Sequence, residues 1–207
     1  SMYSNRIQNY EDMNNENRKG WYTGDGMTYL YNGDLAQFSD DFWPTVDPYR
    51  MPGTTVDTMK RADGSGENVS EESWVGGSAL DNRYGSTGMS YKQWNSSLTA
   101  KKSWFTFENE IIALGAGISS DEDRDVETIV ENRKINNDLS NQLIIDGVAH
   151  ESTDGSEQRY DATWAYLEGN VDGADIGYYF PEGTPLTVKK EQRTGAWSEI
   201  NYGEPSE

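Results

Sequence analysis

The chain has 207 residues, and its 17 lysines and arginines against 36 aspartates and glutamates give a formal net charge of −19 with the single histidine counted neutral. This balance excludes a general role in binding nucleic acid or anionic membranes, because both partners require clustered cations. The absence of cysteine also excludes a disulfide framework, a thiolate nucleophile and cysteine-ligated metal sites.

The first hundred residues predict little regular structure. Residues 14–21 and 24–30 are expected to hold a helical turn or a short strand. Residues 41–53 contain three prolines and are predicted to run as extended chain and turns, since proline is unfavourable inside a helix and restricts the residue before it. Residues 63–73 are rich in glycine, serine and glutamate, which predicts an exposed loop.

Short apolar runs at regular spacing follow from about residue 100 onward. The clearest hairpin joins residues 103–107 to residues 110–114 through the polar turn Glu108-Asn109. Further strands are predicted at residues 126–130, 142–145 with Asp146-Gly147 as the following turn, 163–167, 177–180, 186–190 and 197–201. The pattern predicts an all-β fold, an antiparallel β-sandwich with an irregular N-terminal segment. No repeat or sharp composition break divides residues 1–207, so we expect one unit.

The residues offer little support for hydrolytic chemistry. A Ser-His-Asp hydrolase is improbable, because no Gly-x-Ser-x-Gly elbow occurs and the one imidazole, His150, is expected at the surface or at a strand end. The acid pairs Asp40-Asp41 and Glu71-Glu72 point to opposite faces if they lie on strands, so neither forms a glycosidase dyad by itself. We interpret both pairs as solvated surface.

A turn at residues 121–125 carries carboxylates at alternate positions, as the start of a calcium loop does. It departs from that loop at the sixth position, where Val126 replaces glycine, and at the twelfth, where Asn132 replaces the bidentate glutamate. The sequence therefore predicts no cofactor and no metal site, with calcium at this turn as a weak alternative.

Aromatic residues gather near the N-terminus, among asparagines and aspartates. They are Trp21, Tyr22, Tyr29, Tyr31, Phe42, Trp43 and Tyr49. Flat apolar rings beside amides and carboxylates are what a sugar ring needs, because its C–H face packs on an aromatic while its hydroxyls bind polar groups. An ordinary hydrophobic core of tryptophan and tyrosine explains the cluster equally well.

Longer motifs in one order resemble the central β-domain of polysaccharide lyase family 8, which contains hyaluronate, chondroitin AC and xanthan lyases. The first half contributes NRIQNYEDMNNEN at 5–17, GWYTGDGM at 20–27, FWPTVD at 42–47 and PGTT at 52–55. The second half contributes KSWF at 102–105, EIIALGAGI at 110–118 and ETIVENR at 127–133. The resemblance spans nearly the whole chain.

The resemblance implies β-elimination in an acidic polysaccharide rather than hydrolysis. Such a reaction needs a donor that neutralises the uronate carboxylate, a base for the C5 proton and an acid for the leaving oxygen. In the family these groups are an asparagine, a histidine and a tyrosine on a large helical domain that precedes the β-domain. No catalytic residue is therefore expected in this segment, and His150 does not match the family's histidine.

The resemblance also names candidate substrate-contacting residues. In the chondroitin lyase branch a glutamate and an asparagine three residues later approach the catalytic centre from the β-domain, and Glu11 and Asn14 fit that spacing. Asn17 and Trp21 are expected nearby. These side chains would bind sugar hydroxyls or orient a catalytic side chain of the helical domain. The alternative is that Glu11, Asn14 and Glu16 only satisfy backbone groups of an irregular loop.

The expected partners are the acidic polysaccharide, the helical catalytic domain and the remaining sandwich strands of the same enzyme, with no nucleic acid and no membrane. Composition and resemblance together favour a secreted bacterial protein. Two alternatives stay open: a noncatalytic carbohydrate-binding or structural module, and a segment that folds only within a larger sandwich because missing strands leave an open edge.

Overall fold

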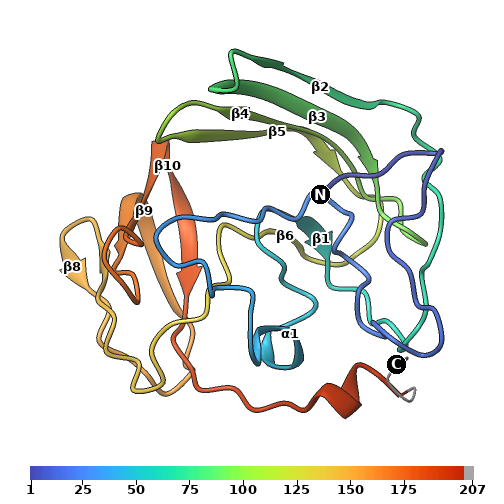
Figure 1. Cartoon of the computed structure of the whole chain (residues 1–207). Helices are drawn as coiled ribbons and strands as arrows, with labels where there is room; N and C mark the ends of the chain where they lie inside the picture. The colour runs from blue at the N-terminus through green and yellow to red at the C-terminus, as the bar shows by residue number, and fades with distance from the viewer. Residues whose placement is uncertain (203–207) are drawn as a thin grey trace. The chain divides into compact units, whose positions relative to one another are not determined.

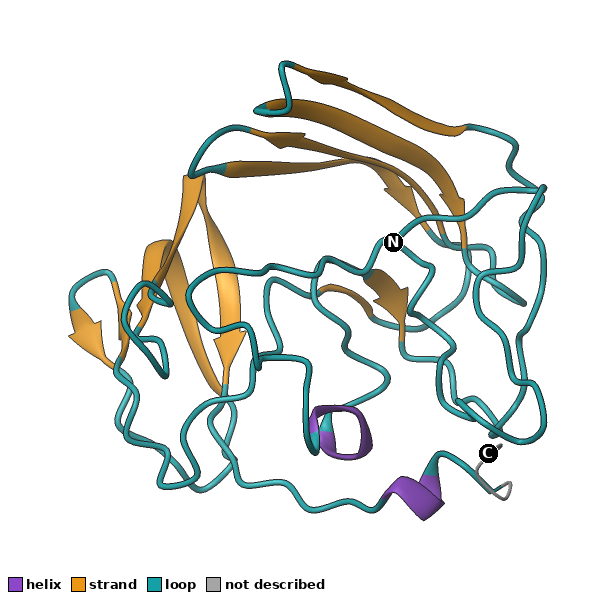
Figure 2. Ribbon diagram, viewed as in Figure 1, coloured by secondary structure: helices purple, strands orange, loops and turns teal. Residues whose placement is uncertain are grey.

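The computed structural model describes residues 1–202, and within them strands and loops predominate (Figures 1 and 2). The chain forms two compact units. The first comprises Ser1–Tyr29, Asp47–Asn132 and the residues from Trp197 onward, and the second comprises Leu30–Val46 and Arg133–Ala196. Composition does not change at these boundaries. The single unit expected for residues 1–207 stays a prediction, because compact units within one chain are not necessarily separate domains.

A four-stranded antiparallel sheet belongs to the first unit (Figure 1). Its strands are β2 (Val75–Leu80), β3 (Tyr84–Lys92), β4 (Thr99–Thr106) and β5 (Ile111–Ser119), in the order β2-β3-β4-β5. The predicted hairpin is confirmed as β4–β5, in which Phe105 lies opposite Ile112 and the amide of Phe107 donates to the carbonyl of Glu110 at 2.8 Å.

One face of this sheet covers the core of the first unit. Buried positions alternate along β4, as the two-residue period of a strand requires, and along β3 the side chains of Met89 and Tyr91 are buried two positions apart. The resulting core cluster consists of Tyr3, Met89, Tyr91, Leu98, Ala100 and Trp104. In contrast, β5 is exposed at every position.

Two short strands lie in the same unit, β1 (Thr55–Asp57) and β6 (Val126–Thr128), and they pair antiparallel. All three residues of β1 are buried. The Lys102 ammonium group of β4 donates to the hydroxyl of Thr55 at 3.0 Å and to the carbonyl of Gly53. This lysine thus connects the large sheet to β1.

The second unit contains another antiparallel sheet, in the order β10-β9-β7-β8. Its strands are β7 (Leu143–Ile145), β8 (Val148–Ala149), β9 (Gln158–Leu167) and β10 (Ile176–Val188). The predicted turn between β7 and β8 is confirmed, since Asp146 and Gly147 have φ values of 47° and 82°, typical of a tight hairpin. The strands predicted at 177–180 and 186–190 form one strand, β10, interrupted by a register shift between Tyr179 and Thr184.

Three predictions about elements are wrong. Residues 197–201 form the 3-10 helix η1 (Trp197–Glu199) and not a strand, because the amides of Ile200 and Asn201 both donate back to the carbonyl of Trp197. Within 41–53, residues Phe42–Thr45 form the one-turn helix α1. Pro44 is tolerated there because the first-turn amides of a helix make no intrahelical hydrogen bond, so the N–H that proline lacks is not needed. Residues 14–21 and 24–30 form neither helix nor strand, only turns and irregular chain.

The antiparallel all-β class is confirmed by the three sheets. No helix in the described residues has the length and hydrophobicity that a membrane crossing requires.

Candidate functional site

Three of the four candidate residues lie on one exposed loop of the first unit, residues 11–18, which we call the asparagine loop. Glu11, Asn14 and Asn17 are exposed in it. Among the residues that the structure describes, the carboxylate of Glu11 and the side-chain amide of Asn14 make no hydrogen bond or ion pair. Both groups are therefore free to bind a ligand.

The backbone of this loop has an unusual conformation. Asn14, Asn15 and Asn17 have φ values of 56°, 60° and 58°, in the left-handed region that asparagine tolerates better than most residues. Two hydrogen-bonded turns accompany them, from the amide of Glu16 to the carbonyl of Met13 at 3.0 Å and from Gly20 to Asn17 at 3.1 Å. Such concentrations of left-handed residues are found at functional sites, where the surrounding structure maintains them.

Asn17 closes the loop. Its side-chain amide donates to the backbone carbonyl of Glu11 at 3.0 Å, which joins the two ends. The side chain of Asn17 is therefore already used to shape the loop, whereas those of Glu11 and Asn14 are not. Asn17, which the alternative did not include, is thus the residue of this loop whose side chain binds a backbone group.

Arg18 fastens the base of the loop and was missed by the sequence analysis. Its guanidinium group donates to the side-chain carbonyl of Asn15 at 2.8 Å and to the backbone carbonyl of Asp63 at 3.2 Å, and it lies 3.5 Å from the carboxylate of Asp12. A Cβ on Gly64 would lie 2.2 Å from that carboxylate, so the loop approaches the backbone of residue 64 closely. No spacing pattern in the sequence indicates these contacts.

Trp21 lies in the core and not on the surface. It is 2% exposed, and its ring centroid lies 5.0 Å from that of Tyr49. The side-chain amide of Asn9 donates to the backbone carbonyls of Trp21 at 3.2 Å and Gly66 at 3.0 Å. A direct sugar contact by Trp21 would require its ring to be exposed, so Trp21 is not part of the proposed sugar-binding surface. Its packing against Tyr49 instead supports the residues that follow the asparagine loop.

Of the seven N-terminal aromatic residues, three are buried, three are half-buried and one is exposed. Trp21, Tyr22 and Phe42 are no more than 2% exposed, whereas Tyr31 is 59% exposed. They also divide between the two units, with Tyr31, Phe42 and Trp43 in the second. Because three of these rings are buried, the cluster seen in the sequence does not form one exposed aromatic surface.

A buried polar group, Asp25, lies in the first unit beside Tyr91, whose hydroxyl donates to its carboxylate at 3.0 Å. Burial raises the pKa of Asp25 to about 7, against the opposing charges of Arg61 and Lys102 and the hydrogen bond from Tyr91. Burial lowers the pKa of Lys102 to about 8. No motif or spacing in the sequence indicates this cluster.

The turn at 121–125 has its own polar partners. Arg124 donates to the buried carboxylate of Asp57 at 2.7 and 3.0 Å, and the Glu122 carboxylate accepts from the amide of Ser97 at 2.8 Å. Hydrogen bonds from Ser97 hold the pKa of Glu122 at about 2. Within residues 1–202, no three carboxylate or imidazole groups lie close enough to hold a metal ion.

His150 directly follows β8, so its expected strand-end position is confirmed, but it is not on the surface. It is 3% exposed, and its Nδ1 lies 3.0 Å from the hydroxyl of Tyr160. Burial lowers its pKa.

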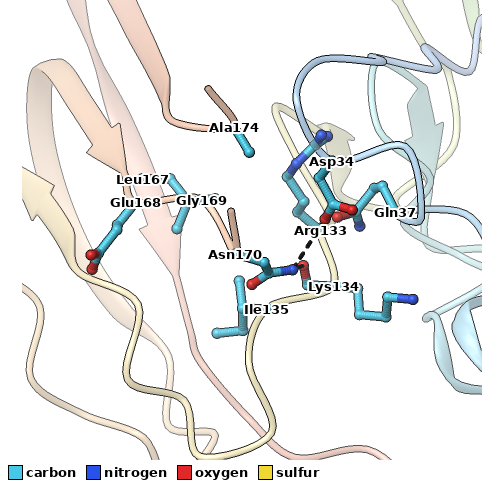
Figure 3. A pocket seen from close by; sticks show the side chains of 10 residues that line it. All are labelled: Asp34, Gln37, Arg133, Lys134, Ile135, Leu167, Glu168, Gly169, Asn170 and Ala174. Atoms are coloured by element: carbon cyan, nitrogen blue, oxygen red, sulfur yellow. Dashed lines mark hydrogen bonds between the residues drawn. The ribbon is translucent and has the colours of Figure 1, made fainter. Parts of the chain in front are cut away.

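The cavities of the second unit do not suit an anionic sugar. One, lined by Asp34, Gln37 and Asn170, measures about 10 Å³, which is room for one water molecule (Figure 3). In it the side-chain amide of Asn170 donates to Asp34 at 3.2 Å and to the carbonyl of Lys134 at 3.1 Å. An open depression of about 470 Å³ carries the carboxylates Asp138, Asp154 and Glu191, which already accept hydrogen bonds or ion pairs from the chain itself, unlike Glu11. The asparagine loop is thus the better candidate site.

Comparison with known proteins gives a consistent result. The sequence model described as "Polysaccharide lyase family 8, super-sandwich domain" matches residues 1–207. The chain is 50% identical to a xanthan lyase of Bacillus sp. (strain GL1) over 203 residues, and 42% identical to the hyaluronate lyase HylB of Enterococcus faecalis over 219 residues. These matches cover 97% and 100% of this chain but 22% and 21% of the relatives.

The fold agrees as well. The structure of Paenibacillus xanthan lyase superposes with a TM-score of 0.90 at 49% identity, covering 98% of this chain and 19% of that one. The description of the matched domain agrees with the predicted sandwich. The chain spans about a fifth of the length of these relatives.

Proposed function

Since the chain belongs to polysaccharide lyase family 8, through its super-sandwich domain, we propose that the complete enzyme depolymerises an acidic polysaccharide by β-elimination. A base removes the C5 proton of a uronate, a C4=C5 double bond forms, the C4–O bond breaks and the leaving oxygen takes up a proton. The observation that supports this proposal is the match over the whole chain to the domain of a lyase family.

The catalytic groups are proposed to lie outside this chain, on the helical domain. The one histidine of the chain, His150, is buried and has its Nδ1 next to the hydroxyl of Tyr160. A base must reach the proton that it removes, so His150 is poorly suited to that role. The 207-residue chain alone is therefore expected to be inactive.

The contribution proposed for this chain is one wall of the substrate cleft, at the asparagine loop. A carboxylate at Glu11 accepts hydrogen bonds from sugar hydroxyls, and an amide at Asn14 both donates and accepts. Both side chains are exposed and unpartnered among the described residues. The guanidinium group of Arg18 holds their loop by donating to the side chain of Asn15 and to the backbone carbonyl of Asp63. Glu11 and Asn14 are suited to bind hydroxyls or to orient a catalytic side chain.

The net charge explains why this wall would not suffice. A segment of charge −19 repels polyanions, so uronate neutralisation and attraction must come from cations elsewhere in the enzyme. We propose a secreted bacterial enzyme whose substrate is hyaluronan, chondroitin or xanthan.

The test is ultraviolet absorbance of the 4,5-unsaturated uronate, measured with the complete enzyme and with the 207-residue chain on each of the three polysaccharides. Product is expected from the complete enzyme only. In the complete enzyme, Glu11→Gln and Asn14→Ala are each expected to lower kcat/KM at least about tenfold. This is the effect expected when a variant loses at least one hydrogen bond to the substrate. Glu71→Gln, an exposed carboxylate of the same unit, is the matched control. Product from the chain alone would refute the placement of the catalytic groups.

A second candidate function, noncatalytic carbohydrate binding, is favoured by a cross-strand aromatic pair of the second unit. Trp164 of β9 and Tyr179 of β10 lie opposite each other and are 40% and 74% exposed. Adjacent exposed rings can stack on a sugar face. If this function holds, Trp164→Ala weakens polysaccharide binding while kcat is unchanged, as measured by affinity electrophoresis and initial rates.

A further inference from the structure

The segment Ile200–Tyr202, which we call the C-terminal clasp, lies beside the asparagine loop within the first unit (Figure 1). The amide of Arg18 donates to the carbonyl of Ile200, and the amide of Tyr202 donates to the carbonyl of Asn15, both at 2.8 Å. The amide of Asn17 donates to the side-chain carbonyl of Asn201 at 2.8 Å. Three consecutive contacts thus bind the loop to residues that follow it by more than 180 positions.

The side chain of Tyr202 completes this attachment. Its hydroxyl donates to the carboxylate of Asp63 at 2.5 Å, and its ring centroid lies 4.9 Å from the guanidinium carbon of Arg18, which stacks over the ring. Arg18 in turn binds the side chain of Asn15 and the backbone of Asp63. Loop, clasp and residue 63 therefore form a closed ring of contacts around one guanidinium group.

The clasp has a conformation of its own. The amides of Ile200 and Asn201 donate to the carbonyl of Trp197 at 3.1 and 2.8 Å, so η1 fixes the chain just before Tyr202. The loop, by contrast, has three left-handed asparagines, each of which is costly in isolation. Its own turns leave the amides of Asn17 and Arg18 without a partner inside the loop, and the clasp supplies one to each.

We propose that Asn201 and Tyr202 are positioning residues for the lyase reaction, which hold the asparagine loop so that Glu11 and Asn14 point at the sugar. This inference rests on the function proposed above. The clasp residues touch no substrate, and they act through the backbone of residues 15–18.

Asn201 allows the sharper test, because two substitutions distinguish the effect of its hydrogen-bond acceptor from the effect of side-chain size. Asn201→Ala removes the oxygen that accepts from the amide of Asn17, and Asn201→Asp keeps an oxygen there. In the complete enzyme, Asn201→Ala is expected to raise KM about fivefold with a smaller change in kcat, and to speed hydrogen exchange of the Asn17 amide about tenfold. Asn201→Asp is expected to restore both. Asn137→Ala, an exposed asparagine of the second unit, is the control.

Tyr202→Phe removes the bond to Asp63 and keeps the ring below Arg18, so a KM increase smaller than that of Asn201→Ala is expected. Unchanged KM and exchange in Asn201→Ala would overturn the proposal. So would equal losses in Asn201→Ala and Asn201→Asp, which would mean a general structural effect. If Glu11→Gln and Asn14→Ala do not change kcat/KM, the proposed function of the loop fails instead, and this result is independent of the exchange data.

Discussion

Asp25 and Asp57 are buried carboxyl groups of the first unit whose pKa values change in opposite directions. Burial dominates at Asp25, where Tyr91 is the one hydrogen-bond donor among the described residues and the pKa rises to about 7. Burial also opposes ionisation of Asp57, but hydrogen bonds from Gln93, Arg124 and Ser96 outweigh it and lower the pKa. The number of donors thus decides the charge of each group.

The titration of Asp25 predicts a pH effect on stability. Its folded pKa lies above the unfolded value of 3.8, so between about pH 4 and 7 the folded state binds more protons and stability falls as pH rises. Asp25→Asn abolishes this loss, roughly 2 to 4 kcal/mol. The difference in melting temperature between wild type and variant should widen from pH 4.5 to pH 7.5, as differential scanning calorimetry would measure.

The comparison with the variant matters because other groups titrate too. The lowered pKa of His150 makes stability rise with pH up to about 6.5, and that of Lys102 acts in the same direction between about 8 and 10.5. The His150 contribution cancels in the difference, because Asp25 is not among the groups that shift the pKa of His150. The charge of Asp25 does raise the pKa of Lys102, but Lys102 contributes above about pH 8, outside the range compared. A difference independent of pH would contradict a raised pKa at Asp25.

Removal of Asp57 is expected to be costly. Its carboxylate accepts from Gln93 at 2.5 Å, Ser96 at 2.8 Å and Arg124 at 2.7 Å, and it is also bound by the amide of Met59 at 3.0 Å. Asp57→Ala leaves these donors unpaired and is predicted to cost about 3 to 5 kcal/mol of unfolding free energy.

The matched control is Glu108→Ala, which removes an ion pair with Arg83 whose two side chains are 51% and 61% exposed. Exposed pairs contribute about 1 kcal/mol or less, so this variant should unfold close to wild type in urea. Similar midpoints for Asp57→Ala and Glu108→Ala would show that the network around Asp57 is dispensable.

Strand prediction succeeded where apolar or β-branched residues were bounded by a turn. The β4–β5 hairpin and the Asp146-Gly147 turn are local patterns, and both are present in the structure. The strands β2 and β3 were missed because glycines interrupt them, at 76, 77, 85 and 88, and glycine has low strand propensity. Their formation depends on pairing with β4, which a local pattern does not record.

The candidate site was predictable only in part. Glu11, Asn14 and Asn17 were named from a resemblance; the structure shows all three exposed, and their role stays a prediction. The roles of Arg18 and Tyr202 were not predictable, because the contact between them joins positions more than 180 residues apart and the Tyr202–Asp63 bond joins positions 139 apart. The buried position of Trp21 likewise follows from packing against Tyr49 and not from its neighbours in sequence.

The approach of two segments next to the asparagine loop gives a prediction at the level of elements. A Cβ on Gly24 would lie 2.0 Å from the backbone carbonyl of Asn9, whereas a Cβ on Gly76 would meet nothing within 4 Å. Gly24→Ala must displace backbone and is expected to cost about 2 to 3 kcal/mol, while Gly76→Ala should be neutral or slightly stabilising. Urea unfolding of the two variants compares them directly, and equal midpoints would contradict the close approach.

On the scale of the whole chain, strong negative charge accompanies an uncovered sheet edge. Within residues 1–202, strand β5 pairs with β4 on one side and with no strand on the other, and all its residues are exposed. It carries Ile111, Ile112, Leu114 and Ile118, each 44% to 53% exposed. Neighbouring residues of a strand point to opposite faces, so both faces of the edge are apolar. Such an edge favours pairing with another chain, and the charge of −19 opposes it.

Salt should therefore decide the association state of the isolated chain. At low ionic strength, repulsion between copies extends over about 30 Å and keeps the chain monomeric, whereas near 1 M salt screening reduces that range to about 3 Å and leaves the apolar edge to pair. Light scattering at the two salt concentrations is expected to show growth in mass at high salt.

The double variant Ile112→Lys with Leu114→Lys places two charges on one face of β5 and should stay monomeric in both conditions. Ile7→Lys is the control: it also replaces an exposed apolar residue (Ile7 is 64% exposed), but one that lies outside any strand. This variant should associate as the wild type does. Association that ignores salt, or that persists in the β5 variant, would locate the contact elsewhere on the chain.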